Sequence, residues 1–162
     1  MIREIRLYGD PVLREKCAPI DEFDLEIQRL IEDLQETMYE ADGIGLAAPQ
    51  IGVSARVFVY DIRDPEVSPG VLVNPEIVDS EGIVKEEEGC LSIPGLAEIV
   101  ERNEAIVVRG LNEDGQSVEL RAEGLLSRCI QHENDHLDGV LFLDRVSPLK
   151  RKMLIRKWQK RD

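Results

Sequence analysis

The segment His132-Glu-Asn-Asp-His136 has a spacing that could bind a metal ion. Two histidines four residues apart lie one above the other on a helix, so both imidazoles can reach one ion. The acid beside the first histidine suits proton transfer, because a carboxyl of adjusted pKa can take a proton from water and pass it to a leaving amine. The pattern is typical of metal-dependent hydrolases, in which the metal lowers the pKa of a water towards about 7.

The residues around this motif predict a helix from Gly124 to Leu137, which ends at Gly139. At about 100° per residue, the histidines and Glu133 fall on the apolar side of this helix. The remaining side is polar and consists of Ser127, Arg128, Gln131, Asn134, Asp135 and Asp138. The alternative is two unrelated histidines on a solvated face, and the apolar neighbours argue against it, since buried polar groups need partners. Burial should also raise the pKa of Glu133, and a nearby cation would oppose that rise.

Two histidines do not complete a metal site, and three cysteines are available as a third ligand. Cys129 is seven residues from His136, about 10 Å along the helix axis, so we expect it to be a small core residue. Cys17 lies in a Pro-containing segment without polar neighbours, and we expect it to pack. Cys90 lies between Gly and Pro, which allow a close approach and a fixed shape. Spacing alone leaves Cys90 and Cys17 about even.

Helix-forming and strand-forming segments alternate along the rest of the chain. Apolar spacing predicts a helix over Leu25–Ala41, capped by Asp21 or Asp24, and Pro148 can start a last helix. Short β-like runs lie between them: Val57–Tyr60, Val71–Val73, Ile77–Val78, Ile83–Val84, Ile99–Val100, Ala105–Val108 and Val118–Leu120, with a hairpin turn at Asn112–Gly115. We predict an α+β fold with mostly antiparallel sheets packed around a central metal-binding helix, an N-terminal helix and a C-terminal helix.

Length and charge limit the kind of protein. A chain of 162 residues suits one domain, which we divide into a catalytic part, 1–147, and a basic C-terminal helix of the same domain, 148–162. Three cysteines without an export signal indicate reduced thiols in a cytoplasmic protein. The whole chain has a net charge of −13. Its last thirteen residues carry seven Lys or Arg and one Asp, a charge of +6, so the remaining residues carry −19. We expect no DNA partner and no membrane span.

Three segments together resemble the peptide deformylase family: Gly43-Ile-Gly-Leu-Ala-Ala-Pro-Gln50, Glu88-Gly-Cys-Leu-Ser92 and Gln131-His-Glu-Asn-Asp-His136. They stand in the family's order and at its separations, and Gly9-Asp-Pro-Val-Leu-Arg14 is also similar to the family. The length and the C-terminal helix resemble its shorter bacterial class. The resemblance implies hydrolysis of the N-formyl group from the formylmethionine of nascent proteins, with release of formate.

The resemblance also implies roles for single residues. Cys90, His132 and His136 bind the metal, with water as fourth ligand, and Glu133 is the general acid and base. Gln50 and the backbone N–H of Leu91 stabilise the oxyanion. The family natively uses Fe(2+) and accepts nickel, cobalt or zinc, and a site with one thiolate and two imidazoles suits all four metals.

For the substrate, the resemblance implies an extended peptide pairing with a strand edge at Ile44 and Gly45, opposite the backbone of Gly89. Arg102 matches a family arginine near the entrance, and the alternative is a solvated rim charge. Three residues of the metal-binding helix are expected to line the methionine pocket: Leu125, Arg128 and Cys129. The stem of Arg128 would line it while its charge reaches water.

Two other functions share part of this pattern. A zinc peptidase also uses H-E-x-x-H, but it usually takes a third ligand from a downstream Glu or His, and neither occurs after His136. A non-catalytic metal-binding module would be expected to lack Glu133, Gln50 or Cys90, and all three are present. For the basic C-terminal helix, the resemblance implies contact with the ribosome, and the alternative is a solvated helix end.

Overall fold

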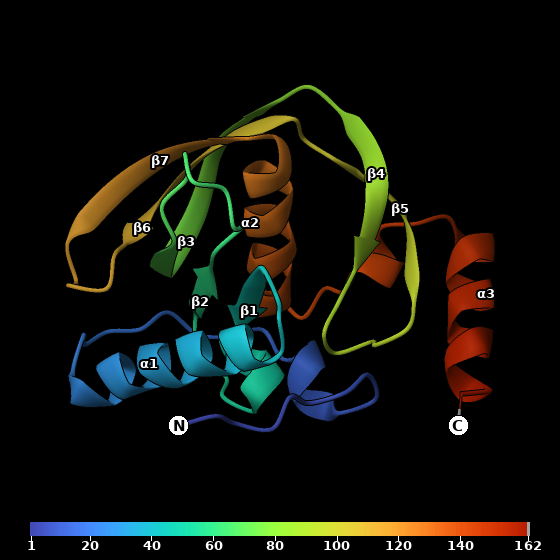
Figure 1. Cartoon of the computed structure of the whole chain (residues 1–162), viewed down its shortest axis with the longest axis horizontal. Coiled ribbons are helices and arrows are strands. Elements are labelled where there is room, and N and C mark those ends of the chain that lie inside the picture. Colours follow the sequence, from blue (N-terminus) through green and yellow to red (C-terminus); the bar gives the residue numbers. More distant parts are fainter. Residues whose placement is uncertain (162) are drawn as a thin grey trace.

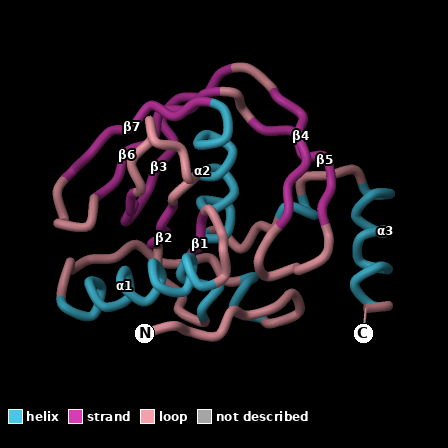
Figure 2. Tube along the Cα trace, in the orientation of Figure 1, coloured by secondary structure: helices cyan, strands magenta, loops and turns pink. Residues whose placement is uncertain are grey.

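The computed structural model describes residues 1–161 and has the predicted α+β architecture (Figures 1 and 2). Its helices are α1 (Leu25–Glu40), α2 (Gly124–Leu137) and α3 (Pro148–Gln159). Its strands are β1 (Gly45–Ala47), β2 (Val57–Tyr60), β3 (Gly70–Glu81), β4 (Val84–Gly89), β5 (Ala97–Arg102), β6 (Ala105–Leu111) and β7 (Ser117–Glu123). Within the described residues, no helix is both long and apolar enough to cross a bilayer. Asp162, the last residue of the expected basic helix segment, lies outside the described part.

The strands form two antiparallel sheets. The larger has the order β1-β2-β3-β6-β7, and the smaller is the β4–β5 hairpin. The runs at Val71–Val73 and Ile77–Val78, predicted as separate strands, belong to the single strand β3. The register between β3 and β6 shifts twice, and such irregularities break the alternation of apolar residues along a continuous strand. The predicted turn between β6 and β7 is confirmed, with the Asn112 side chain accepting hydrogen bonds from two backbone N–H groups within it.

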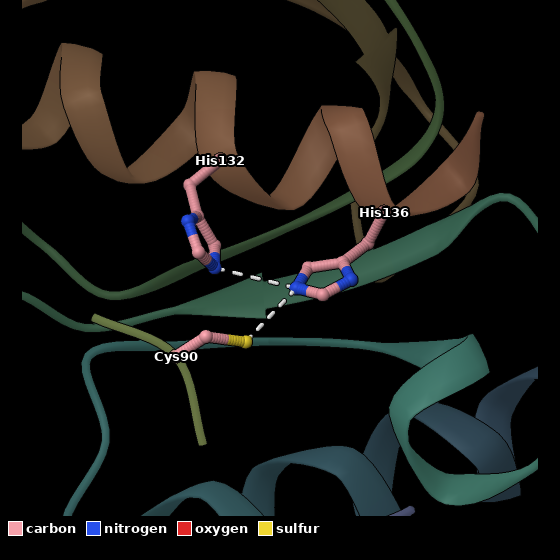
Figure 3. Close-up of side chains that lie close together, drawn as sticks. All are labelled: Cys90, His132 and His136. Atoms are coloured by element: carbon pink, nitrogen blue, oxygen red, sulfur yellow. Dashed lines mark hydrogen bonds between the residues drawn. The ribbon is translucent and has the colours of Figure 1, made fainter. Parts of the chain in front are cut away.

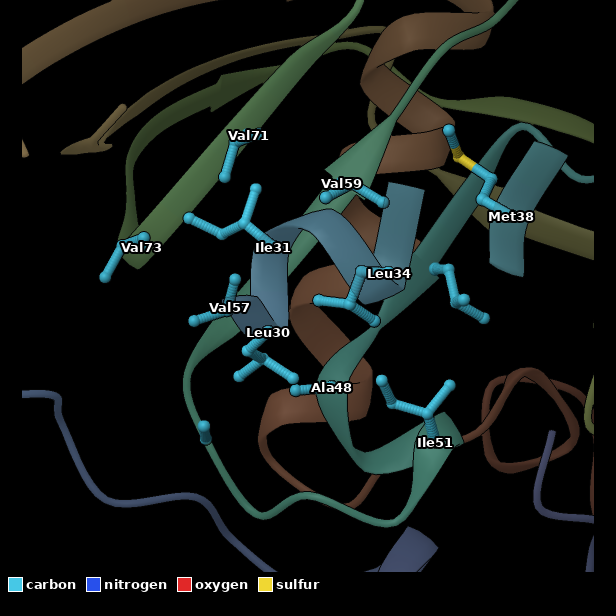
Figure 4. Packing of buried hydrophobic residues seen from close by; sticks show 12 residues of the cluster. Leu30, Ile31, Leu34, Met38, Ala48, Ile51, Val57, Val59, Val71 and Val73 are labelled. Carbon is cyan, nitrogen blue, oxygen red and sulfur yellow. The ribbon is translucent and has the colours of Figure 1, made fainter. Parts of the chain in front are cut away.

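Helix α1 covers the end of the large sheet that carries β1 and β2. Of the two candidate caps, Asp24 is the one used, and its carboxylate accepts a hydrogen bond from Ile27 N at 3.1 Å. The apolar face of α1 packs on the valines of β2 and β3 (Figure 4); its buried members include Leu30, Ile31, Leu34 and Met38. This packing holds β1 as an edge strand whose outer side is free of other strands.

Helix α2 lies between the large sheet and the β4–β5 hairpin (Figure 1). Its polar side is also largely buried, with Ser127, Arg128, Gln131 and Asp135 all inside the protein. The hairpin and the chain around Asn103 cover this side, and the polar groups find partners there. Ser127 Oγ and Gln131 Nε2 each donate a hydrogen bond to the Asn103 carbonyl, both at 2.9 Å.

Helix α3 is anchored to the body of the protein. Ser147 caps its start, and Leu154 and Trp158 are buried in a cluster with Ile93 and Phe142. Because Ile93 follows closely after β4, this cluster supports the turn that leads out of that strand. The basic side chains of α3 point away from the cluster and are exposed or half-exposed.

Candidate active site

Cys90, His132 and His136 lie together in the structure (Figure 3). Cys90 directly follows β4, and the two histidines extend from successive turns of α2. His136 Nε2 lies 3.4 Å from Cys90 Sγ and 3.3 Å from His132 Nε2. A tetrahedral ion with nitrogen ligands at about 2.0 Å and sulfur at about 2.3 Å separates its ligand atoms by roughly 3.3–3.6 Å. Two of the three separations match this range, and all three donor atoms lie within 4.8 Å of one another, so they could hold a single metal ion.

The other two cysteines lie elsewhere. Cys17 is buried, with the Ser54 hydroxyl 3.7 Å from its sulfur, so the expectation that it packs is confirmed. Cys129 is also buried, in the cluster behind α2, as expected of a small core residue. Burial raises the pKa of both thiols, which disfavours the thiolate that metal binding requires.

Glu88 is a functional residue that sequence reasoning missed. Its Oε2 lies 2.6 Å from His132 Nδ1, so the ring presents Nε2 to the metal position. Burial by itself raises the pKa of Glu88, but the bonds from His132 and Arg102 outweigh burial and hold it well below the usual range. The available signal was an acid two residues before Cys90 in the Glu88–Ser92 motif.

Two arginines differ from their expected positions. Arg102 was predicted near the entrance, but it is only 6% exposed and does not line the substrate cleft. Its guanidinium donates hydrogen bonds to Glu88 at 3.0 and 2.7 Å and to Asp135 at 2.7 Å. Arg128 does line the cleft, but its charge does not reach water, because it is also 6% exposed and pairs with Glu88 at 3.0 Å. Both predictions assumed a solvated arginine, whereas a buried carboxylate holds each guanidinium inside.

Glu133 is positioned for proton transfer. It is 4% exposed, and its Oε2 lies 4.0 Å from His132 Nε2. Its other oxygen is buried and has no hydrogen-bond partner among residues 1–161. Burial raises the pKa of Glu133 to about 7, against the opposing effect of His132. A carboxyl with this pKa can both accept and donate a proton near neutral pH.

Gln50 is fixed beside the cysteine. Its Oε1 accepts a hydrogen bond from Ala47 N at 3.0 Å, and its Nε2 donates to Ser92 Oγ at 3.1 Å. The same nitrogen lies 3.6 Å from Cys90 Sγ. One N–H of the side-chain amide is thus bonded to Ser92, and the other faces Cys90. Leu91 follows Cys90 in the turn after β4 and lines the same cleft.

The cleft has a volume of about 470 Å³ and opens between β1 and the end of β4. Every predicted substrate-binding residue except Arg102 lines it: Ile44, Gly45, Gly89, Leu125, Arg128 and Cys129. The backbone of β1 comes very close to the Glu133 carboxyl. A Cβ atom on Gly45 would lie 2.6 Å from Glu133 Oε2, so only glycine fits there without movement.

The three sequence motifs thus meet at one cleft, and comparison with known proteins agrees with that grouping. The family model described as polypeptide deformylase matches residues 2–152. The chain belongs to the polypeptide deformylase family. A peptide deformylase of Acidothermus cellulolyticus is 55% identical over 155 residues, which are 96% of this chain and 84% of the relative. That of Thermodesulfovibrio yellowstonii is 49% identical over 160 residues, 98% and 97% of the two chains.

A solved deformylase structure has the same fold. The crystal structure of a peptide deformylase from Legionella pneumophila is 49% identical and superposes with a TM-score of 0.93, covering 99% of this chain and 95% of that one. The chain is therefore a deformylase-type hydrolase that removes the N-formyl group from formylmethionyl peptides, and the alternative of a zinc peptidase is wrong. Deformylases depend on a metal, for which this chain offers Cys90, His132 and His136.

Proposed function

We propose that this deformylase holds its metal on Cys90, His132 and His136 and performs the hydrolysis with Glu133, Gln50 and Leu91. The observation that carries this assignment is the convergence of three ligand atoms, with neighbouring atoms 3.3 and 3.4 Å apart. Cys90 and His132 line the cleft, and His136 is fully buried beside them. A divalent ion bound there supplies a Lewis acid that makes water a nucleophile near neutral pH.

In the proposed reaction, Glu133 moves the proton. Its carboxylate takes a proton from the attacking water as the water oxygen bonds to the formyl carbon. It then returns that proton to the amide nitrogen as the C–N bond breaks, so that a free amine and formic acid leave, and the acid gives its remaining proton to the solvent to become formate. Burial favours the protonated carboxyl that returns the proton, and a cation bound beside it would favour the carboxylate that accepts it.

Gln50 and the N–H of Leu91 are the proposed donors to the oxyanion that forms from the formyl oxygen. The Gln50 carbonyl is fixed by Ala47 N, so its amide cannot turn away. The Gln50 nitrogen is farther from Cys90 than from Ser92. The N–H that faces Cys90 is therefore the one available to the substrate. Preorganised donors of this kind stabilise the charge of the transition state without moving.

The proposed substrate lies extended between Ile44–Gly45 and Gly89. Because β1 is an edge strand of the described sheet, a peptide can pair along its outer side, except at Ala47, whose N–H already donates to Gln50 Oε1. The methionine side chain would enter the cleft among Leu125, Arg128 and Cys129. Arg102 has no place in this proposal, because it lies behind Glu88 and away from the cleft.

Glu133→Gln tests the proposal most directly. Since Glu133 is not a proposed ligand, the variant should keep one metal per chain and lose at least the ~10²–10⁴-fold that general acid–base catalysis contributes. Deformylation of a formyl-Met peptide and metal content are measured on the same preparation. Near-normal turnover would require a different base, and loss of metal would make Glu133 a ligand.

We further propose that the bound ion is Fe(2+), in a cytoplasmic enzyme. The donor set accepts iron, nickel, cobalt or zinc, and the resemblance to the family favours iron. All three cysteines of the described chain are free, in keeping with a reducing compartment. Elemental analysis of protein purified without oxygen decides the metal, and stoichiometric zinc in that preparation would overturn the proposal.

We propose that residues 1–147 and the basic segment 148–162 form one domain.

We also propose that α3 contacts the ribosome. Lys150 pairs with Glu98 and Arg151 with Asp144, so reversing these two charges would also disturb the fold. Charge reversal at Lys152, Arg156 and Lys160 is the cleaner test. Salt-sensitive co-sedimentation with ribosomes should be lost, with cleavage of small formyl peptides unchanged. Unchanged binding at low salt would leave α3 a solvated helix end.

A further inference from the structure

Arg128 connects the metal-binding helix to β4. It lies one helical turn before His132 on α2. Its Nη1 donates a hydrogen bond to Glu88 Oε1 at 3.0 Å, and its Nη2 donates to the Val84 carbonyl at 2.9 Å. Val84 begins β4 and Glu88 is near its end, so the guanidinium holds the strand at two points. The same residue lines the cleft.

The Glu88 carboxylate uses every acceptor position that it has. Oε1 accepts from Arg128 Nη1 and Arg102 Nε, both at 3.0 Å. Oε2 accepts from Arg102 Nη2 at 2.7 Å and meets His132 Nδ1 at 2.6 Å. Each carboxylate oxygen has two lone pairs, so four donors fill the group and leave it a single orientation. That orientation sets the direction of the His132 ring.

The two arginines are not equivalent. Arg102 is shared between Glu88 and Asp135, and Asp135 also pairs with the half-exposed Arg145. Arg128, in contrast, makes its only ion pair within the described chain with Glu88. Both Arg128 and Glu88 are buried, and removing one partner of a buried pair leaves the other charge uncompensated.

We propose that Arg128 is a positioning residue for the metal site: it fixes Glu88, and through Glu88 the ring of His132, while its stem forms a wall of the cleft. This proposal rests on the metal site proposed above. One side chain then links the shape of the substrate pocket to the affinity for the metal. If Arg128 were only a wall, its replacement would change substrate preference and leave metal binding unaltered.

The test is the affinity for nickel of Arg128→Met, measured by competition with a chelator, with no activity assay involved. Methionine keeps an apolar stem and removes the charge. Loss of a partner that orients a ligand typically costs 10–100-fold in metal affinity, and we expect a loss in that range. Arg128→Lys should recover part of it, because an ammonium can still reach Glu88. An affinity of Arg128→Met within about twofold of the original would overturn the proposal.

Two further variants separate the possible causes. In a Glu88→Ala background, Arg128→Met should add little further loss, because the effect runs through Glu88; full additivity would contradict this route. Arg145→Met is the matched control, since it removes a charge from the same network without touching Glu88 or the cleft, and it should keep the nickel affinity. If Cys90→Ala also kept that affinity, the metal site itself would be wrong, independently of Arg128.

Discussion

Gly45→Ala tests how tightly β1 and the carboxyl of Glu133, the proposed general acid and base, are fitted together. The new Cβ would lie 2.6 Å from Glu133 Oε2 and 2.9 Å from Cys129 Sγ. Ordinary contact begins at 3.4 Å, so the carboxyl oxygen must retreat by roughly 0.8 Å. The Cys129 sulfur is the less crowded of the two, at 2.9 Å against 2.6 Å for the carboxyl oxygen, so the larger displacement falls on Glu133.

The size of the effect follows from this displacement. A misplacement of about 1 Å at a reacting group can cost on the order of 10²-fold in rate. We therefore expect kcat of Gly45→Ala to fall by roughly 10²-fold, about 2.7 kcal/mol of transition-state stabilisation. The metal content should stay unchanged, because neither Gly45 nor Glu133 is a proposed ligand.

Steady-state deformylation of a formyl-Met peptide gives kcat and KM, and elemental analysis gives the metal. Gly43→Ala is the matched control. Its Cβ would meet the Leu91 side chain at 2.7 Å, and this flexible side chain can turn aside, so kcat should stay within a few-fold of the original. A Gly45→Ala enzyme with normal kcat would refute the argument from Glu133. A rise in KM alone would mean that the methyl group obstructs the peptide instead.

Three further predictions concern the same site. Metal and activity should both be lost when any of the three proposed ligands is replaced, as in Cys90→Ala, His132→Ala and His136→Ala, whereas Cys17→Ser should keep both. Stoichiometric metal in Cys90→Ala would exclude Cys90 as a ligand. Gln50→Ala should keep the metal and lose on the order of 10²-fold in kcat as one oxyanion donor goes; a change confined to KM would argue against that role. In air, the iron form should lose activity faster than the nickel form through oxidation of the metal or the Cys90 thiolate, and equal half-lives would count against iron as the sensitive component.

Local patterns in the sequence were enough to predict most of the elements. The spacing of apolar residues predicted α1, and a single carboxylate at Asp24 marks its start. The same spacing placed His132, Glu133 and His136 on one side of α2, where they are found buried. Both predictions depend on residues within four or five positions of each other, and this range is what helical periodicity describes.

The burial of charged residues could not be predicted in the same way. Arg102 and Arg128 are 26 residues apart in sequence and meet at the carboxylate of Glu88. Their environment exists only because the β4–β5 hairpin folds over α2, which is a long-range contact with no periodic signature. Cys90 posed the same difficulty, since its spacing to the histidines did not distinguish it from Cys17. The resemblance to the family made that distinction before the structure did.

The anchoring of α3 has a geometric consequence for any surface that binds its charges. Leu154 and Trp158 fix the helix to the cluster that also contains Ile93, three residues after Cys90. A basic tail on a flexible linker would only raise the local concentration of the enzyme near a partner. A docked helix additionally fixes the distance and the angle between the bound surface and the mouth of the cleft. Peptides emerging from a bound partner would thus meet the cleft from one constant direction.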